Sequence, residues 1–176
     1  FHQHGPQQQF GNYGLSFICN MSFYSELFTG TTLAFSQEQQ RILTSLLLEG
    51  YQWIIWRGYW DVNALNRQLF RNADIDKGFS LLFAAHSLMK SSEPEVADQI
   101  KKMILRNSSF SQVPNSFTGN KHFRESDYTV HRTPTWLASV RMASERVIGT
   151  ELVNEDNLKG YYMADGALYT YVHGGE

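Results

Sequence analysis

Five side chains suited to acid–base chemistry stand out in the sequence. His4 and Tyr13 lie in residues 1–14, a segment interrupted by glycine and proline, and irregular segments of this kind often carry functional groups. Arg67 and Arg71 follow four residues apart, and Glu151 comes after a strand-like stretch. Because no nucleophile with an accompanying base is evident, the set favours proton transfer near an anionic group.

These residue types fit β-elimination from a uronic acid sugar. The reaction removes a weakly acidic proton next to a carboxylate, so the enzyme must neutralise that carboxylate to stabilise the developing enolate-like charge. A tyrosine can act as the base if neighbouring cations lower its pKa from about 10, and it can then return the proton to the leaving glycosidic oxygen. Arginine suits carboxylate or sulfate groups because its fork donates two parallel hydrogen bonds.

Structural roles also explain each of these residues when it is taken alone. His4 and Tyr13 have the surroundings of turn or surface residues, and Glu151 is explained by a pairing with a surface arginine. On a helix, Arg67 and Arg71 would share one face, which is explained by a solvated basic surface as well as by an anionic ligand. The residues make elimination plausible and leave these alternatives open.

Composition excludes several other classes of protein. The chain has 176 residues, of which 42% are hydrophobic and 18% charged, so it is globular rather than disordered. The net charge of −2 gives no field that would recruit nucleic acid, and no apolar run reaches membrane-spanning length. Cys19 is the single cysteine, and His122 and His131 lack zinc-ligand spacing, so we expect no metal site.

Hydrophobic periodicity predicts an α+β protein. Ser36 and Gln39 have the spacing of a capping box, and Pro94 suits the start of a later helix. The expected helices cover residues 15–30, 36–56, 62–71, 77–89 and 92–105, and the expected strands cover residues 126–132, 135–142 and 166–172. We therefore expect a helical domain over residues 1–112 and the beginning of a β-domain over residues 113–176.

Several of these segments resemble polysaccharide lyase family 8, which includes chondroitin AC, hyaluronate and xanthan lyases. The stretch from His4 to Tyr13, His-Gly-Pro-Gln-Gln-Gln-Phe-Gly-Asn-Tyr, is similar to the catalytic His/Tyr segment of the chondroitin AC type, and Asn66-Arg67-Gln-Leu-Phe-Arg71 is similar to the paired-arginine helix. Later segments resemble the first strands of the family's β-domain: residues 115–123, 127–132, 139–142 and 151–160. The similarity follows the whole chain in the family's order.

The resemblance implies the end of an incomplete α/α toroid that leads into an antiparallel β-sandwich, with the active site between them. It implies that His4 helps to neutralise the uronate carboxylate and that Tyr13 is the base and then the acid. Arg67 would favour the phenolate of this tyrosine. In the substrate cleft, Arg71 would hold acidic groups, Glu151 would orient the Arg and His side chains, and Asn154 would contact the sugar.

By the same resemblance, we expect a secreted or periplasmic, monomeric enzyme that acts on an acidic polysaccharide. No cofactor, nucleic acid or membrane partner is expected. The family's catalytic Asn and aromatic substrate-binding patch lie upstream of the His, so we expect this chain to be part of a longer enzyme and to hold an incomplete site. Asn66 also stands where the family usually has glycine. Two alternatives remain open: a non-catalytic carbohydrate-binding remnant and a glycoside hydrolase on an α/α toroid, which would need two carboxylates.

Overall fold

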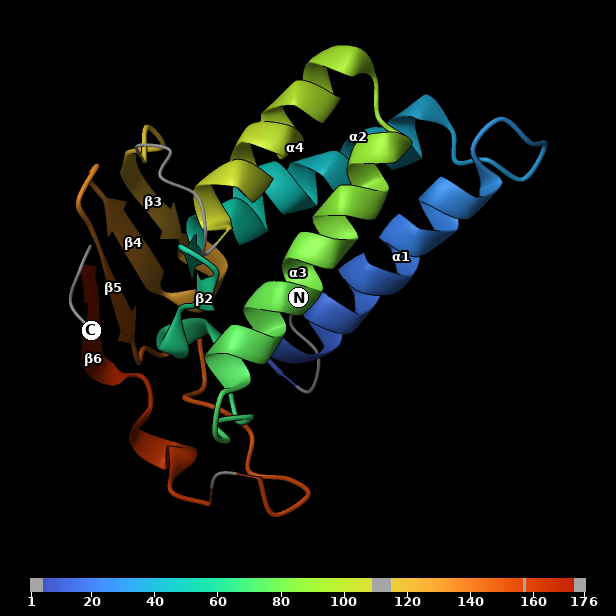
Figure 1. Cartoon of the computed structure of the whole chain (residues 1–176). Helices are drawn as coiled ribbons and strands as arrows, with labels where there is room; N and C mark the ends of the chain where they lie inside the picture. Colours follow the sequence, from blue (N-terminus) through green and yellow to red (C-terminus); the bar gives the residue numbers. More distant parts are fainter. Residues whose placement is uncertain (1–4, 109–114, 157, 173–176) are drawn as a thin grey trace.

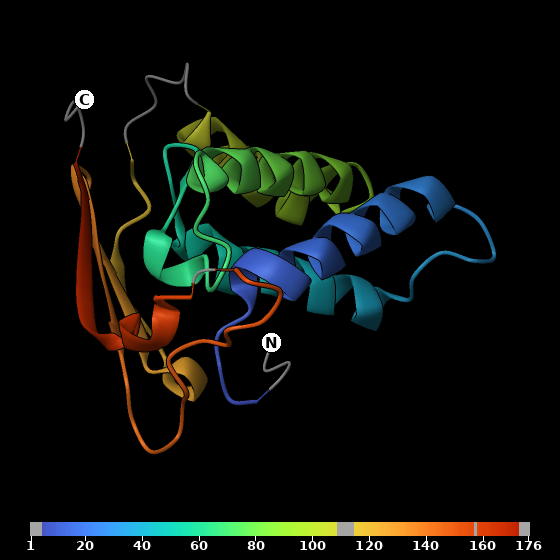
Figure 2. The same cartoon turned by 90° about the horizontal axis from the view of Figure 1, so that it is seen from below.

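The computed structural model describes residues 5–108, 115–156 and 158–172. Helices occupy the first part of the chain and an antiparallel sheet the last part, which confirms the α+β class (Figure 1). Figure 2 shows the sheet at one side of the molecule and the long helices at the other, with the segment of residues 46–65 between them. No helix in the described part of the chain is long and apolar enough to cross a bilayer.

Among the described residues, four α-helices build the helical part. Helix α1 (Leu15–Phe28) packs against α3 (Ala73–Lys90), and α3 also packs against α4 (Pro94–Asn107). Helix α2 (Gln37–Ser45) begins with the predicted capping box, because the Ser36 hydroxyl accepts from the Gln39 amide while the Gln39 side chain accepts from the Ser36 amide. The α3 helix starts earlier than predicted, after Asn72 in a left-handed conformation.

The expected long second helix is shorter than predicted. After α2 the chain continues through the π-helical turn η2 (Leu46–Gly50) and the 3₁₀ turn η3 (Tyr51–Trp53) into a hairpin of β1 (Ile55–Trp56) and β2 (Tyr59–Trp60). Arg57 and Gly58 form the turn with φ of 50° and 89°, as two-residue hairpins require. Gly78 of α3 packs so closely on this turn that a Cβ there would lie 1.8 Å from the Gly58 oxygen.

The expected helix over residues 62–71 is wrong. A 3₁₀ turn, η4 (Val62–Ala64), is followed by irregular backbone, with Asn66 left-handed at φ of 61°. The buried Asn66 side chain bonds to residues distant in the sequence, and these contacts outweigh the local helical pattern. Arg67 and Arg71 therefore do not share a helix face.

In the described part of residues 115–172, the strands form a four-stranded antiparallel sheet in the order β3-β4-β5-β6. Its strands are β3 (Gly119–Phe123), β4 (Tyr128–Arg132), β5 (Trp136–Met142) and β6 (Asp165–Val172), with the 3₁₀ turns η5 (Arg124–Ser126) and η6 (Gly160–Tyr162) between them. The last three strands agree with the predicted ranges. Gly119 and Asn120 begin β3. On one face of the sheet, the side chains of Tyr128, Val130 and Leu137 are buried.

A buried carboxylate joins the sheet to the segment after the hairpin. Asp61 Oδ1 accepts from the Tyr171 hydroxyl at 2.9 Å, and Asp61 Oδ2 accepts from the Tyr128 hydroxyl. Burial raises the pKa of Asp61, while these hydroxyl donors oppose the rise. Asn63 Nδ2, in η4, also donates to the Ser139 hydroxyl of β5 at 2.9 Å. The helical part and the sheet are thus fixed to each other beside the candidate site.

Candidate active site

Tyr13 is placed by a short, tightly packed helical turn. It lies half-buried in η1 (Phe10–Gly14), a π-helical turn that runs directly into α1. Gly11 allows this turn to pack closely against the end of η4 and the loop after it. A Cβ at Gly11 would lie only 2.8 Å from the Ala64 oxygen and from Leu65. The contact brings the loop that carries Arg67 beside Tyr13, with the guanidinium carbon 5.8 Å from the centroid of the phenol ring.

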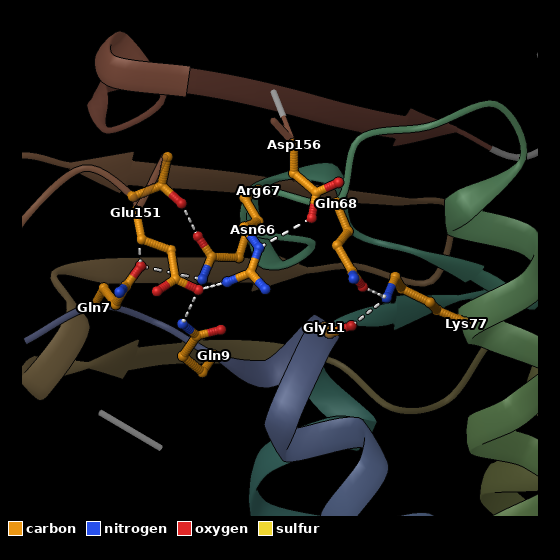
Figure 3. Close-up of polar contacts among 10 residues, drawn as sticks. Gln7, Gln9, Gly11, Asn66, Arg67, Gln68, Lys77, Glu151 and Asp156 are labelled. Atoms are coloured by element: carbon orange, nitrogen blue, oxygen red, sulfur yellow. Dashed lines mark hydrogen bonds and ion pairs between the residues drawn. The ribbon is translucent and has the colours of Figure 1, made fainter. Parts of the chain in front are cut away.

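Arg67 is buried between two carboxylates of the segment after β5. Its Nη1 makes an ion pair with Glu151, whose side chain is 6% exposed, and its Nε lies 3.1 Å from Oδ2 of Asp156 (Figure 3). Gln9 Nε2 donates to Glu151 Oε1 at 3.1 Å. The guanidinium plane is therefore held from two sides, and Glu151 is held in turn by the N-terminal segment.

Hydrogen bonds of side-chain amides hold the backbone next to both members of the Arg67–Glu151 pair. Gln7 Oε1 accepts from the Glu151 amide nitrogen at 2.9 Å and from Asn66 Nδ2 at 3.3 Å. The Thr150 hydroxyl donates to Asn66 Oδ1. Asn66 thus fits this left-handed position, since asparagine tolerates the left-handed conformation better than most residues.

Lys77 approaches the same region from α3. It is buried, and its Nζ donates to the Gly11 oxygen and, at 2.8 Å, to Gln68 Oε1 (Figure 3). Burial lowers the pKa of Lys77 to about 8, and the negative charge of Asp156 partly opposes this. The sequence held a signal for this residue, because Lys77 stands at helical spacing from Leu81 and Leu88, which face the core.

The structure brings together Tyr13, Arg67 and Glu151 of the expected site residues. His4 lies outside the described residues. Arg71 and Asn154 are exposed, and their side chains make no hydrogen bond or ion pair within the described part of the chain. Four further residues, which the sequence did not predict, lie around the site through the contacts above: Gln7, Gln9, Lys77 and Asp156.

No metal centre accompanies this arrangement in residues 5–108, 115–156 and 158–172, where no group of three or more His, Cys, Asp or Glu is placed to hold an ion. The site is instead an arrangement of one phenol, one guanidinium, one ammonium and two carboxylates. Such a set can transfer a proton at the phenol and can orient an anionic ligand through its cations.

Comparison with known proteins assigns the chain to a class. Residues 118–176 match the family model described as polysaccharide lyase family 8, super-sandwich domain. Chondroitinase-AC of Pedobacter heparinus is 30% identical over 177 residues, covering 99% of this chain and 25% of that protein. Hyaluronate lyase of Thermasporomyces composti is 24% identical over 200 residues, covering 96% of this chain and 26% of that protein.

Solved structures agree with this assignment. A chondroitinase AC lyase structure superposes with a TM-score of 0.82 at 26% identity, covering 100% of this chain and 26% of that one. A Paenibacillus xanthan lyase has the same fold, with a TM-score of 0.88 at 17% identity, covering 98% of this chain and 19% of that one. The chain belongs to polysaccharide lyase family 8. It spans about a quarter of the length of the curated relatives it matches.

Proposed function

We propose that the full-length protein carrying this chain cleaves a uronic-acid-containing polysaccharide of the chondroitin, hyaluronan or xanthan type by β-elimination. The observation that carries the proposal is the half-buried phenol of Tyr13 beside the fixed guanidinium of Arg67. Family membership supports it, as do relatives named chondroitinase and hyaluronate lyase.

In the proposed reaction Tyr13 first accepts a proton and then donates it. Its phenolate takes the proton next to the uronate carboxylate, and the electron pair of that C–H bond forms the new carbon–carbon double bond. The bond to the glycosidic oxygen breaks, and the Tyr13 hydroxyl returns the proton to that oxygen. The products are a sugar with a free hydroxyl and an unsaturated uronate end, so no water is consumed.

Arg67 and the carboxylates have different parts in this proposal. The guanidinium beside the Tyr13 ring stabilises the phenolate electrostatically. Because Glu151 and Asp156 together carry more negative charge than Arg67 offsets, neutralising the substrate carboxylate requires further cations. We assign this to His4 and to the exposed Arg71, with Asn154 as a sugar contact.

The wider architecture is part of the same proposal. We infer that residues 1–112 end an incomplete α/α toroid, that residues 113–176 begin a β-sandwich, and that the cleft lies between them. The order of helices and then antiparallel strands supports this inference. We place the enzyme outside the cell or in the periplasm, where such a large acidic polymer is accessible, and expect a monomer that needs no cofactor.

The test is ultraviolet absorbance of the full-length protein incubated separately with chondroitin, hyaluronan and xanthan. Rising absorbance from an unsaturated uronate is expected, and Tyr13→Phe should reduce the rate at least about a hundredfold, because a general acid–base residue typically contributes 10²–10⁴-fold. Tyr161→Phe is the matched control, because Tyr161 is 70% exposed and distant from Arg67 in the sequence. It should leave the rate unchanged.

Other outcomes would identify the alternatives. New reducing ends without the absorbance would mean hydrolysis, and binding without either product would mean a carbohydrate-binding remnant. The structure gives one observation relevant to hydrolysis, since Glu151 and Asp156 are two neighbouring carboxylates. Both contact the same guanidinium, whereas a hydrolase places its carboxyl groups on either side of the scissile bond and protonates one of them. This pairing favours elimination.

A further inference from the structure

Lys77 is a buried cation that the proposed reaction does not use. It stands on the first turns of α3, and its Nζ points away from this helix towards two other segments (Figure 3). One is η1, the turn that carries Tyr13, and the other is the irregular loop that carries Arg67. A lysine with a long apolar stem and a charged tip in this position makes contacts that an apolar residue of the same size would not.

The two hydrogen bonds reach the immediate neighbours of the site residues. Nζ donates to the main-chain oxygen of Gly11, two residues before Tyr13, and to Oε1 of Gln68, the residue after Arg67. Each acceptor belongs to irregular or π-helical backbone. Without Lys77, the Gly11 oxygen and the Gln68 side-chain oxygen would each lose a buried donor.

Lys77 lies near one carboxylate and one aromatic ring. Asp156, in the segment after β5, attracts the ammonium group and also pairs with Arg67. The Phe70 ring lies 5.9 Å from Nζ. Asp156 therefore attracts both cations, through its ion pair with Arg67 and its coulombic effect on Lys77.

We propose that Lys77 is a positioning residue that holds the Tyr13 turn and the Arg67 loop at their working separation. This inference rests on the proposed elimination, because it assigns Lys77 a role in aligning the phenol with the guanidinium. Lys77 acts through these two segments and touches neither the substrate nor the reacting atoms. Its effect belongs to the turnover of bound substrate, since misplacement of a reacting group by about 1 Å can reduce the rate about a hundredfold.

The experiment compares Lys77→Met, Lys77→Gln and Lys90→Met in the full-length protein. Methionine keeps the apolar stem and removes the donor, and glutamine keeps a donor. Lys90 is the matched control, because it ends the same helix with a half-exposed side chain that pairs with Glu26. We expect Lys77→Met to lower kcat about 10- to 100-fold with KM within about threefold, Lys77→Gln to lower kcat less, and Lys90→Met to leave both unchanged.

Hydrogen exchange of the unliganded proteins supplies a readout that does not require activity. We expect Lys77→Met to exchange at least about tenfold faster over residues 7–14 and 65–70, with unchanged rates in α4. If Lys77→Met keeps the wild-type kcat while Tyr13→Phe is inactive, the inference about Lys77 is overturned and the proposed function stays intact. A wild-type protein that forms no unsaturated product would overturn the elimination, and exchange would then decide whether Lys77 holds these two segments.

Discussion

Lys77 is the residue whose ionisation the fold perturbs most directly at the candidate site. Its ammonium group is buried between η1 and the loop of Gln68, and Asp156 supplies the nearby negative charge. Burial favours the neutral amine, so the pKa falls to about 8 in the folded protein. In the unfolded chain a lysine pKa lies at about 10.4.

This difference predicts how stability changes with pH. Between about pH 8 and 10.4 the unfolded chain binds a proton at Lys77 that the folded protein has lost, so this group makes the free energy of unfolding rise with pH. Below pH 8 both states are protonated and the contribution is constant. Urea unfolding of the wild type and of Lys77→Met at pH 7.5, 9 and 10.5 measures this contribution to the free energy of unfolding. The free energy of the wild type minus that of the variant should increase across this series, and a flat or falling difference would contradict the shifted pKa.

At the residue scale, the sequence and its family resemblance pointed to Tyr13, Arg67 and Glu151, and the structure places these three together. The sequence did not point to Asp156 or Lys77. Both depend on pairings between segments far apart in the chain, and a single sequence contains no direct record of such pairings. The lysine at a core-facing helix position was the one local sign, because a buried charge is rarely without a partner.

At the scale of elements, the loop after η4 shows where local patterns fail. The sequence of residues 62–71 has helical periodicity, yet Asn66 takes φ of 61° and its side chain bonds to Gln7 and Thr150. By contrast, the capping box of α2 and the strands β4 and β5 were predictable, since hydrogen bonds and side-chain alternation within each segment determine them. Irregular segments near the site depend on distant contacts and were not predictable in this way.

The conformation of Asn66 gives a prediction at this scale. Asn66→Ala and Asn66→Gly both remove the bonds to Gln7 and Thr150, but alanine adds the strain of a left-handed backbone. This strain costs about 1–2 kcal/mol, and the greater freedom of glycine in the unfolded chain offsets part of it. We therefore expect the alanine variant to be less stable than the glycine variant by about 1 kcal/mol. Denaturant unfolding of the two variants measures this difference, and an alanine variant as stable as the glycine variant would argue against the strained loop.

At the scale of the whole molecule, buried polar groups join the helical part to the sheet. Asp61 binds the hydroxyls of Tyr128 and Tyr171, and Arg132 Nη1 donates to the main-chain oxygens of Trp53 and Ile55, each at 2.9 Å. Burial lowers the pKa of Arg132 to about 9, with the charge of Arg106 adding to the effect. These bonds cross from β4 and β6 to the segment that leads into the Arg67 loop.

Tyr171 provides the test of this interface. Its hydroxyl donates to Asp61 and accepts from the Val62 amide at 2.7 Å, so Tyr171→Phe leaves two buried polar groups without this partner. We expect a loss of about 1–3 kcal/mol in the free energy of unfolding, the usual cost of an unsatisfied buried group. Tyr169→Phe is the control on the same strand, because its side chain is 40% exposed. If the interface couples the two parts, helical circular dichroism and tryptophan fluorescence should shift together in Tyr171→Phe and remain unchanged in the control. Equal stability of the two variants would mean that apolar packing, rather than the buried carboxylate, holds the sheet against the helices.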